Sequence, residues 1–235
     1  MTGTRYLFLA FFLLLSPAWT WASPVGAVTA SEGQTEIIHP GQPGIPASAG
    51  MPVHTGDLAK TEKGSKIEIR FDDGSIIRIG ENSRAEISEY LFQDDRVLAK
   101  IFLHGGKIRS IVKKAAQIFG MEEANRFEVH TDTAVIGVRG TDFVTSRREK
   151  VVRATFITGE GYCYHRGNPE AVEKVVSGQS VTVSQTDVPP QVQPADEAET
   201  QEDIKDTTTW KDSDFMPPDF MHNAGLDDTR TASPY

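Results

Sequence analysis

The chain of 235 residues contains a single cysteine, Cys163, and this scarcity limits how the protein can be stabilised. One cysteine cannot form an intramolecular disulfide. The histidines are scattered without i, i+4 pairs or clustered carboxylates, which predicts no structural metal. They are His39, His54, His104, His130, His165 and His222. An ordinary apolar core must therefore stabilise the fold, and a domain of about 150 residues is long enough to bury one.

Long hydrophobic runs are also rare, and the clearest one, Leu7–Leu15, lies near the N-terminus behind Arg5. A basic residue, a short apolar stretch and small residues at Thr20 and Ala22 are typical of an export signal cleaved before Ser23. The run is shorter than the roughly 20 apolar residues that a membrane anchor needs. We expect residues 1–22 to be a signal peptide, and the mature chain to be periplasmic or secreted without a membrane span.

Basic residues are few in the last part of the chain. Residues 187–235 contain twelve acidic and three basic residues, so this segment accounts for the whole formal net charge of −9. Such acidity argues against a nucleic-acid partner. Several prolines and the lack of a periodic apolar pattern predict a disordered acidic tail over 187–235. Its repeat DFMPPDFM contains Phe215 and Phe220, which are either a docking motif or a chance feature of a biased composition.

Convincing helical patterns are absent between Val25 and Ser184, whereas strand patterns recur about every 8 to 12 residues. Ile67, Ile69 and Phe71 alternate with charged residues, and Asp73-Gly74 predicts a tight turn before the next alternating segment. Separate strands are expected at 97–103 and 107–112. The sequence therefore predicts an all-β single domain over 23–186, built from many short strands in a sandwich or a solenoid-like arrangement.

The segment TDTAVIGVRGTDFVTS, residues 131–146, contains an arginine between two glycines. If a strand runs through it, both faces are largely apolar and Arg139 points into a core. The motif is Gly137, Val138, Arg139, Gly140 and Thr141. Two hypotheses stay open: Arg139 is an internal staple that donates to strand carbonyls and to Asp142 or Asp132, or it binds an anion or a partner carboxylate at an exposed groove. The apolar neighbours favour the staple.

Catalytic constellations are hard to find. Cys163 and His165 share one face of a predicted strand, but a packed thiol beside a solvated histidine explains them more simply than a nucleophile and its base. Adjacent carboxylates lie mostly in predicted turns, where they make poor acid/base pairs. No phosphate loop, dinucleotide fingerprint or GxSxG elbow occurs. We therefore predict no cofactor, and a binder or scaffold and not an enzyme.

Four segments resemble, in order, the pattern of FecR domains: GDLAKTEKGSKIEIRFDDGSIIRIGENSRAEISEY, GGKIRSIV, FEVHTDTAVIGVRGTDF and SGQSVTV. The resemblance covers Val25 to about Ser184. It implies an all-β, extracytoplasmic and non-catalytic domain. The best-known members relay occupancy of a siderophore receptor to a sigma factor, and they carry a cytoplasmic domain and a membrane helix where this chain is expected to have a signal peptide.

The resemblance and the missing catalytic patterns favour an interaction module of the cell envelope, whose partner is an envelope protein or a surface polymer. The docking surface would be the exposed face of the sheet, the Arg139 segment, or the aromatic residues of the tail. A second hypothesis is a carbohydrate-active or cell-wall enzyme on a β-solenoid that uses Asp72, Asp73 and Glu81. A third is a structural component of a secretion or surface assembly.

Overall fold

The computed structural model describes residues 23–94, 96–113, 126–185 and 189–208. Within these ranges every element of regular secondary structure except one helix is a strand, which confirms the predicted all-β class. The strands are β1 (Gly26–Glu32), β2 (Thr35–Ile38), β3 (Ile45–Pro46), β4 (Pro52–Val53), β5 (Leu58–Thr61), β6 (Lys66–Phe71), β7 (Ile76–Ile79), β8 (Arg84–Gln93), β9 (Arg96–Ile111), β10 (Arg126–His130), β11 (Ala134–Val138), β12 (Asp142–Arg148), β13 (Val151–Thr158), β14 (Glu160–His165), β15 (Asn168–Val176), β16 (Gln179–Val183) and β17 (Gln191–Pro194). The helix α1 spans Glu197–Thr207, and no helix of the described ranges has the length and apolar character to cross a membrane.

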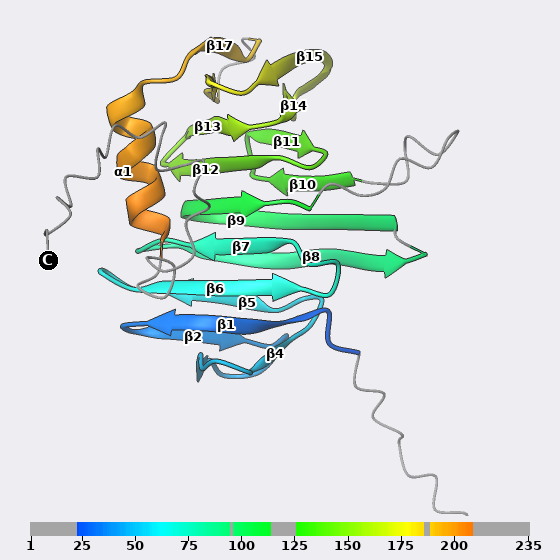
Figure 1. Ribbon diagram of the computed structural model, residues 1–235, viewed down its shortest axis with the longest axis vertical. Helices are drawn as coiled ribbons and strands as arrows, with labels where there is room; N and C mark the ends of the chain where they lie inside the picture. The colour runs from blue at the N-terminus through cyan, green and yellow to red at the C-terminus, as the bar shows by residue number, and fades with distance from the viewer. Residues whose placement is uncertain (1–22, 95, 114–125, 186–188, 209–235) are drawn as a thin grey trace, which may run out of the picture.

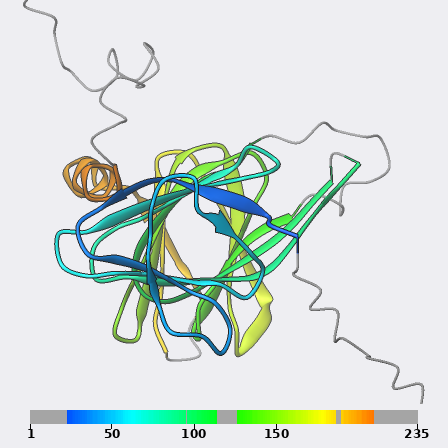
Figure 2. The same cartoon turned by 90° about the horizontal axis from the view of Figure 1, so that it is seen from below.

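The strands form two sheets that share β9. Sheet A has the order β4-β1-β6-β7-β9-β12-β13-β16-β17. Sheet B has the order β3-β2-β5-β8-β9-β10-β11-β14-β15. The chain crosses between the sheets in short runs and climbs from β1 and β2 at one end to β15 and β17 at the other (Figure 1). Seen along this direction, the strands surround a common interior (Figure 2). The fold thus combines both predicted arrangements, facing sheets and solenoid-like stacking.

The long strand β9 joins the two sheets and corrects one sequence expectation. Its first part pairs with β8 in sheet B, and its last part, residues 106–111, pairs with β12 in sheet A. The sequence predicted two separate strands here, 97–103 and 107–112, with Gly105 and Gly106 in the gap between them. Instead Gly106 adopts a φ of 90° within the strand, where a side chain would strike Ser83. The glycines bend β9 from one sheet into the other.

The core lies between the sheets and consists mainly of isoleucine, valine and phenylalanine. The predicted inward-facing residues of β6 and β7 are buried, with exposed fractions of 0 to 2%: Ile67, Ile69, Phe71, Ile77 and Ile79. Each such side chain contributes roughly 1.5 to 3 kcal/mol when it is fully buried. Alternation along each strand therefore fixes which face points inward, and a one-residue shift in pairing would expose the whole set.

The C-terminal part of the described chain corrects the prediction that the tail beginning at residue 187 is disordered. Residues 189–208 contain β17, which pairs with β16, and α1, which lies along the stack (Figure 1). Asp196 caps the helix by accepting the backbone N–H of Glu199 at 2.9 Å. Lys107 of β9 forms ion pairs with Asp203 at 2.6 Å and with Asp206 at 2.8 Å. Residues 209–235 lie outside the described ranges.

Candidate interaction surface

The segment around Arg139 is a corner that carries the chain from β11 in sheet B to β12 in sheet A. Gly140 has a φ of 64°, in the left-handed region that glycine adopts without strain. A second corner, between β13 and β14, packs against it so closely that a Cβ on Gly159 would lie 2.9 Å from the carbonyl oxygen of Gly140. The buried Thr141 ties the corners together by donating to the carbonyl of Glu160 at 2.8 Å. The motif is therefore first a structural joint.

Gly137 is required because the ring of Tyr162 lies across it. Glu128, Gly137 and Tyr162 occupy one row across three neighbouring strands of sheet B. A Cβ on Gly137 would overlap with Cζ of the Tyr162 ring. Since no side chain intervenes, the Tyr162 hydroxyl reaches over β11 and donates to Oε1 of Glu128 at 2.8 Å. An aromatic ring that covers a glycine in this way restores the packing that the sheet loses there.

Glu128 is the third member of this row, and its carboxylate is buried, with an exposed fraction of 4%. Burial alone would raise its pKa, but hydrogen bonds from His130 and Tyr162 and the nearby charges of His130 and Arg126 outweigh burial and lower it. The Nε2 atom of His130 lies 2.6 Å from Oε2. Burial, reinforced by Glu128, raises the pKa of Tyr162, so its hydroxyl keeps its proton and acts as a donor.

Replacing Gly137 by alanine should displace the Tyr162 ring and break its hydrogen bond to Glu128. We expect the free energy of unfolding to fall by about 2 kcal/mol, because a buried carboxylate loses a partner and a packed ring moves. Chemical denaturation would measure this loss. Tyr162→Phe is the matched control, since it removes only the hydroxyl, and it should cost less than Gly137→Ala; an equal or larger cost would contradict the steric role of Gly137.

Arg139 is exposed, so the hypothesis of an internal staple is wrong. The alternation of faces ends at the corner, because β11 stops at Val138. Val138 itself is buried. Within the described residues, the guanidinium of Arg139 forms no hydrogen bond or ion pair that would hold it in place. The other hypothesis, an exposed basic group available to an anion or a partner carboxylate, therefore stays a prediction.

Asp142 and Asp132, the expected partners of Arg139, bind other arginines. Asp142 accepts two hydrogen bonds from Arg109 of β9, at 2.9 Å from Nε and 2.6 Å from Nη2. Asp132 pairs with Arg147 at 2.6 Å. The buried arginine that the sequence led us to expect is thus Arg109, whose exposed fraction is 8%. Asp142 is a structural partner, and it is not free to bind a ligand. Phe215 and Phe220 of the tail lie outside the described residues.

Cys163 and His165 are both buried on the same face of β14. Packing of the thiol is as predicted, and burial raises the pKa of Cys163 to about 12, which keeps it protonated and unreactive. The prediction of a solvated histidine is wrong, since the exposed fraction of His165 is 7% and its Nδ1 accepts the N–H of Gly167 at 3.0 Å.

The carboxylates proposed for an enzyme also have structural partners. Asp73 is buried, with Oδ1 accepting the N–H of Ser75 at 3.1 Å and Oδ2 accepting its hydroxyl at 2.6 Å. Glu81 accepts the N–H of Gly64 at 2.6 Å. Asp72 lies exposed in the turn. Asp73 and Glu81 thus stabilise turns, as the simpler interpretation of such residues expects.

The hairpin of β8 and β9 extends beyond the other strands (Figures 1 and 2). Near its tip, Leu91 and Phe92 are exposed at 56% and 39%. Its base is fixed, because the ring of Tyr90 stacks on Phe71 at 4.9 Å and its hydroxyl donates to Asp73 at 3.0 Å. Large apolar side chains on a protruding hairpin with a fixed base are typical of a contact surface.

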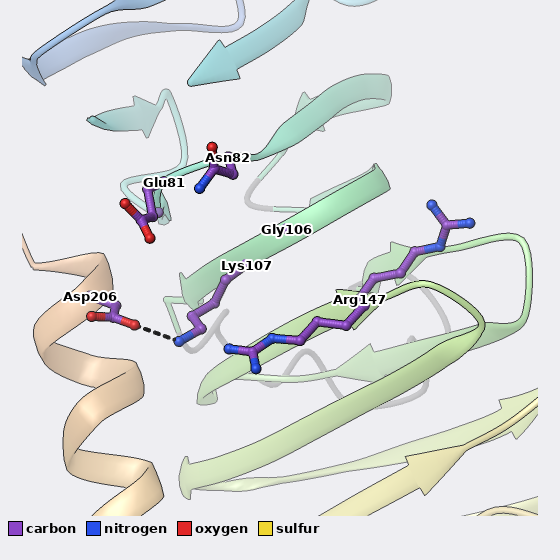
Figure 3. A pocket seen from close by; sticks show the side chains of 8 residues that line it. Glu81, Asn82, Gly106, Lys107, Arg147 and Asp206 are labelled. Carbon is purple, nitrogen blue, oxygen red and sulfur yellow. Dashed lines mark hydrogen bonds and ion pairs between the residues drawn. The ribbon is translucent and has the colours of Figure 1, made fainter. Parts of the chain in front are cut away.

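A pocket of about 370 Å³ lies between α1 and the strands of sheet A (Figure 3). Its charged lining includes Lys107, Arg147 and Asp206. Lys107 donates to Asp206 at 2.8 Å, and Arg147 donates to Asp132 at 2.6 Å. Arg148 also lines the pocket. Because two of the three cations, Lys107 and Arg147, are already paired, the pocket resembles a joint between the helix and the sheet more than an anion site.

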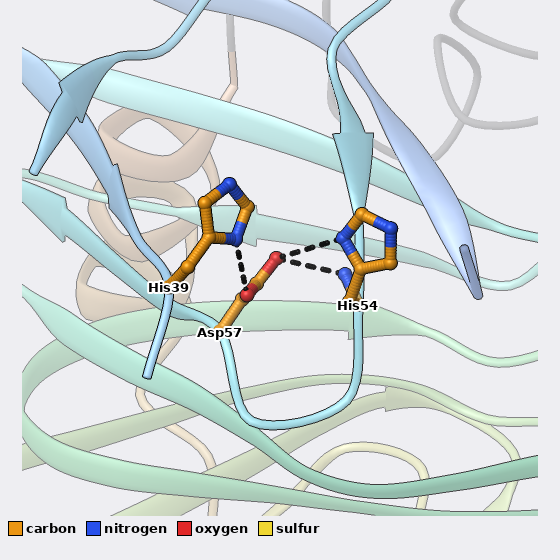
Figure 4. A group of neighbouring side chains, drawn as sticks. All are labelled: His39, His54 and Asp57. Atoms are coloured by element: carbon orange, nitrogen blue, oxygen red, sulfur yellow. Dashed lines mark hydrogen bonds and ion pairs between the residues drawn. The ribbon is translucent and has the colours of Figure 1, made fainter. Parts of the chain in front are cut away.

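Two of the histidines judged to be scattered come together in space. His39 and His54 both direct Nδ1 toward the buried carboxylate of Asp57 (Figure 4). Local spacing could not predict this cluster, because His39 follows β2 whereas His54 and Asp57 belong to the turn before β5. The premise that the histidines lie apart from one another and from carboxylates therefore fails for His39 and His54, and the absence of a structural metal stays a prediction.

Comparison with known proteins gives a family for the central part of the chain. Residues 57–160 match the sequence model of the family described as FecR protein. No curated protein matches the sequence. Two crystal structures of a protein proposed to be an anti-sigma factor, from Parabacteroides distasonis ATCC 8503, resemble the chain with a TM-score of 0.48 and 16% identity. Each match covers 61% of this chain and 62% of the other, so the similarity spans only about three fifths of that protein. The matched residues 57–160 run from just before β5 to the start of β14, so the similarity to the FecR family covers this central part of the chain.

Proposed function

We propose that this FecR-domain protein is a non-catalytic interaction module of the cell envelope, and that it binds an envelope protein through the β8–β9 hairpin. The proposed location has two supports, the export-signal pattern of the first 22 residues and the envelope association typical of FecR proteins. The observation that carries the binding role is the exposed pair Leu91 and Phe92 on a hairpin with a fixed base.

The hairpin suits protein binding for two physical reasons. Burying a leucine and a phenylalanine side chain against a partner gains roughly 1.5 to 3 kcal/mol each, a large share of a typical contact energy. The anchored base also limits the conformational entropy that is lost on binding, since the hairpin need not fold on its partner. An aromatic pair also lies in the same sheet on β14, separated from β9 by β10 and β11: Tyr162 and Tyr164 stack in parallel at 6.2 Å and are partly exposed.

Affinity capture from envelope extract tests the proposal. We expect the double variant Leu91→Ser, Phe92→Ser to lose the captured partner by at least about tenfold, with little change in stability because both side chains are already exposed. Val172→Ser is the matched control, since Val172 is an apolar residue of β15 exposed at 52%. A partner captured equally by the wild type and the double variant would contradict the hairpin as the binding surface.

A further inference from the structure

Three metal-ligating side chains meet at one end of the stack (Figure 4). His39 directly follows β2, and Asp57 directly precedes β5. These strands pair with Ile38 opposite Leu58, so the next residues along the ladder, His39 and Asp57, face each other. His54 follows β4 and enters the same turn. The strand register therefore brings together residues that are 18 positions apart in the sequence.

The donor atoms are arranged within the range that one ion can bridge. The Nδ1 atom of His39 lies 2.6 Å from Oδ1 of Asp57, and Nδ1 of His54 lies 3.6 Å from Oδ2. All three ligand atoms lie within 4.8 Å of one another. Zinc bonds of about 2 Å in tetrahedral geometry place ligand atoms roughly 3.3 Å apart. Side-chain movements on the order of 1 Å would accommodate an ion, without a change in backbone.

The charge of Asp57 favours a cation at this point. Its exposed fraction is 1%, and a buried carboxylate is costly unless positive charge or hydrogen bonds compensate it. Among the described residues, its ion-pair partners are the two imidazoles, and no lysine or arginine reaches it. The carboxylate of Asp57 also accepts a hydrogen bond from the backbone N–H of His54, at 2.8 Å from Oδ2. A divalent ion would supply the missing charge.

The protons of the site can rearrange to admit an ion. Nδ1 of His39 lies 2.6 Å from Oδ1 of Asp57, and because an ionised carboxylate can only accept, this hydrogen bond requires the proton of the ring on the inner nitrogen. Metal binding requires that nitrogen to be free, and the proton can move to the Nε2 atom, which points away from Asp57 in both rings (Figure 4). The side chains of His39 and His54 are exposed at 23% and 20%, which leaves a path to solvent.

The backbone holds the site rigidly. A turn is closed by the N–H of Asp57 donating to the carbonyl of His54 at 3.1 Å, with Gly56 at a φ of 92°. The turn is bonded to β8, since Gly56 donates to Ile87 at 2.7 Å and Ile87 donates to Asp57 at 2.9 Å. Ligands on such a fixed turn lose little entropy when an ion binds.

We propose that His39, His54 and Asp57 form a binding site for a divalent transition-metal ion, with zinc as the preferred occupant. Two imidazoles and one carboxylate are a ligand set that zinc favours over calcium or magnesium, whose preferred ligands are all oxygen. Three protein ligands leave a fourth position toward solvent. A water molecule or a side chain of a docked partner can fill that position.

Titration of the untagged, metal-free protein with zinc chloride, followed by calorimetry, tests the proposal. We expect one ion bound per chain, and a four-coordinate visible absorption spectrum when cobalt(II) replaces zinc. His54→Ala is the informative variant, because the structural hydrogen bond to Asp57 comes from the backbone of residue 54 and remains. It should weaken zinc binding by at least about tenfold while the circular dichroism spectrum stays unchanged. Asp57→Asn should weaken it as strongly.

His104→Ala is the matched control, since His104 pairs with Glu86 at 2.9 Å as a single exposed histidine and carboxylate. It should leave zinc affinity and stoichiometry unchanged. Three outcomes would overturn the proposal: wild-type protein that binds no zinc at one ion per chain, binding that His54→Ala does not weaken, or binding that His104→Ala weakens as much. Any of them would leave the cluster as a polar joint that only fixes the turn.

Discussion

Replacing Arg109 by alanine is expected to lower the free energy of unfolding by about 3 kcal/mol, because it leaves the carboxylate of Asp142 largely buried without its partner. The two side chains are exposed at 10% and 17%, and two parallel hydrogen bonds join them. They link β9 to the start of β12, next to the corner that contains Gly140. Urea denaturation, with the slope and midpoint compared to wild type, would measure the loss.

Two further variants make this prediction specific. Arg109→Lys should recover only part of the loss, because an ammonium group cannot donate in the planar, two-pronged geometry of a guanidinium. Arg139→Ala is the control for a nearby arginine, and since Arg139 is exposed it should change stability by no more than about 0.5 kcal/mol. A large cost for Arg139→Ala, or none for Arg109→Ala, would reverse the structural assignment of the two residues.

Arg109 is buried and Arg139 is exposed, and this difference shows how far a local sequence pattern can predict the placement of a side chain. The sequence pattern predicted β11 with its observed bounds, Ala134–Val138. All five residues are buried, because both faces of the strand are covered. The pattern failed when it was continued through Gly140, because a left-handed residue ends the alternation. Arg109 belongs to another strand, 33 residues before Asp142, and a local pattern carries no information about such a pairing.

Glycines also limited the prediction of strand bounds in β9. The predicted strands 97–103 and 107–112 left Gly105 and Gly106 in a gap, because a local pattern cannot distinguish the end of a strand from a bend within one. The distinction depends on neighbours: Arg84 pairs with Gly105 in sheet B, and Arg147 pairs with Gly106 in sheet A. Hydrogen bonds from both sheets keep the bent segment extended.

The histidine cluster was also beyond local patterns. His54 and Asp57 are three positions apart, and such a spacing is common in turns. Their convergence with His39 follows from the pairing of β2 with β5, which is a tertiary fact. By contrast, the apolar faces of β6 and β7 were predictable, because burial on one side of a strand leaves its period in the sequence.

The acidic C-terminal segment shows how composition can mislead. Its high negative charge and prolines are typical of disorder, yet Asp196 followed by Glu199 was a visible capping signal at the start of α1. Only Ile204 supplies a large apolar side chain to the buried side of the helix. The missing information was the basic surface of sheet A, since Lys107, Lys66 and Arg153 come from three strands that the helix crosses.

Ending the chain after Val188 is therefore expected to lower the melting temperature, by roughly 4 to 12 °C for a loss of about 2 to 3 kcal/mol. An isolated helix of 11 residues is marginal in water, so α1 is ordered because docking stabilises it. Truncation removes the buried Ile204 and the partners of Lys107 and Arg153, as well as the strand β17 that covers the edge of β16. Differential scanning calorimetry would measure the shift.

The pH dependence of the melting temperature and a second truncation would show whether the loss of α1 causes the expected drop in stability. Burial lowers the pKa of Lys107, but its hydrogen bonds to Asp203 and Asp206 outweigh burial and raise it above the ordinary value of 10.5. Because the pKa of Lys107 is raised in the folded state, the stabilisation by its ion pairs is fully present at any pH below the pKa of the unfolded chain. This stabilisation is lost as the pH rises through the pKa of the folded state. The deficit of the shorter chain should therefore persist at neutral pH and shrink in alkali above the lysine range. A chain that ends after Thr208 keeps α1 and should have the melting temperature of the full chain. If the chain that ends after Val188 also had that melting temperature, the helix would contribute nothing to stability.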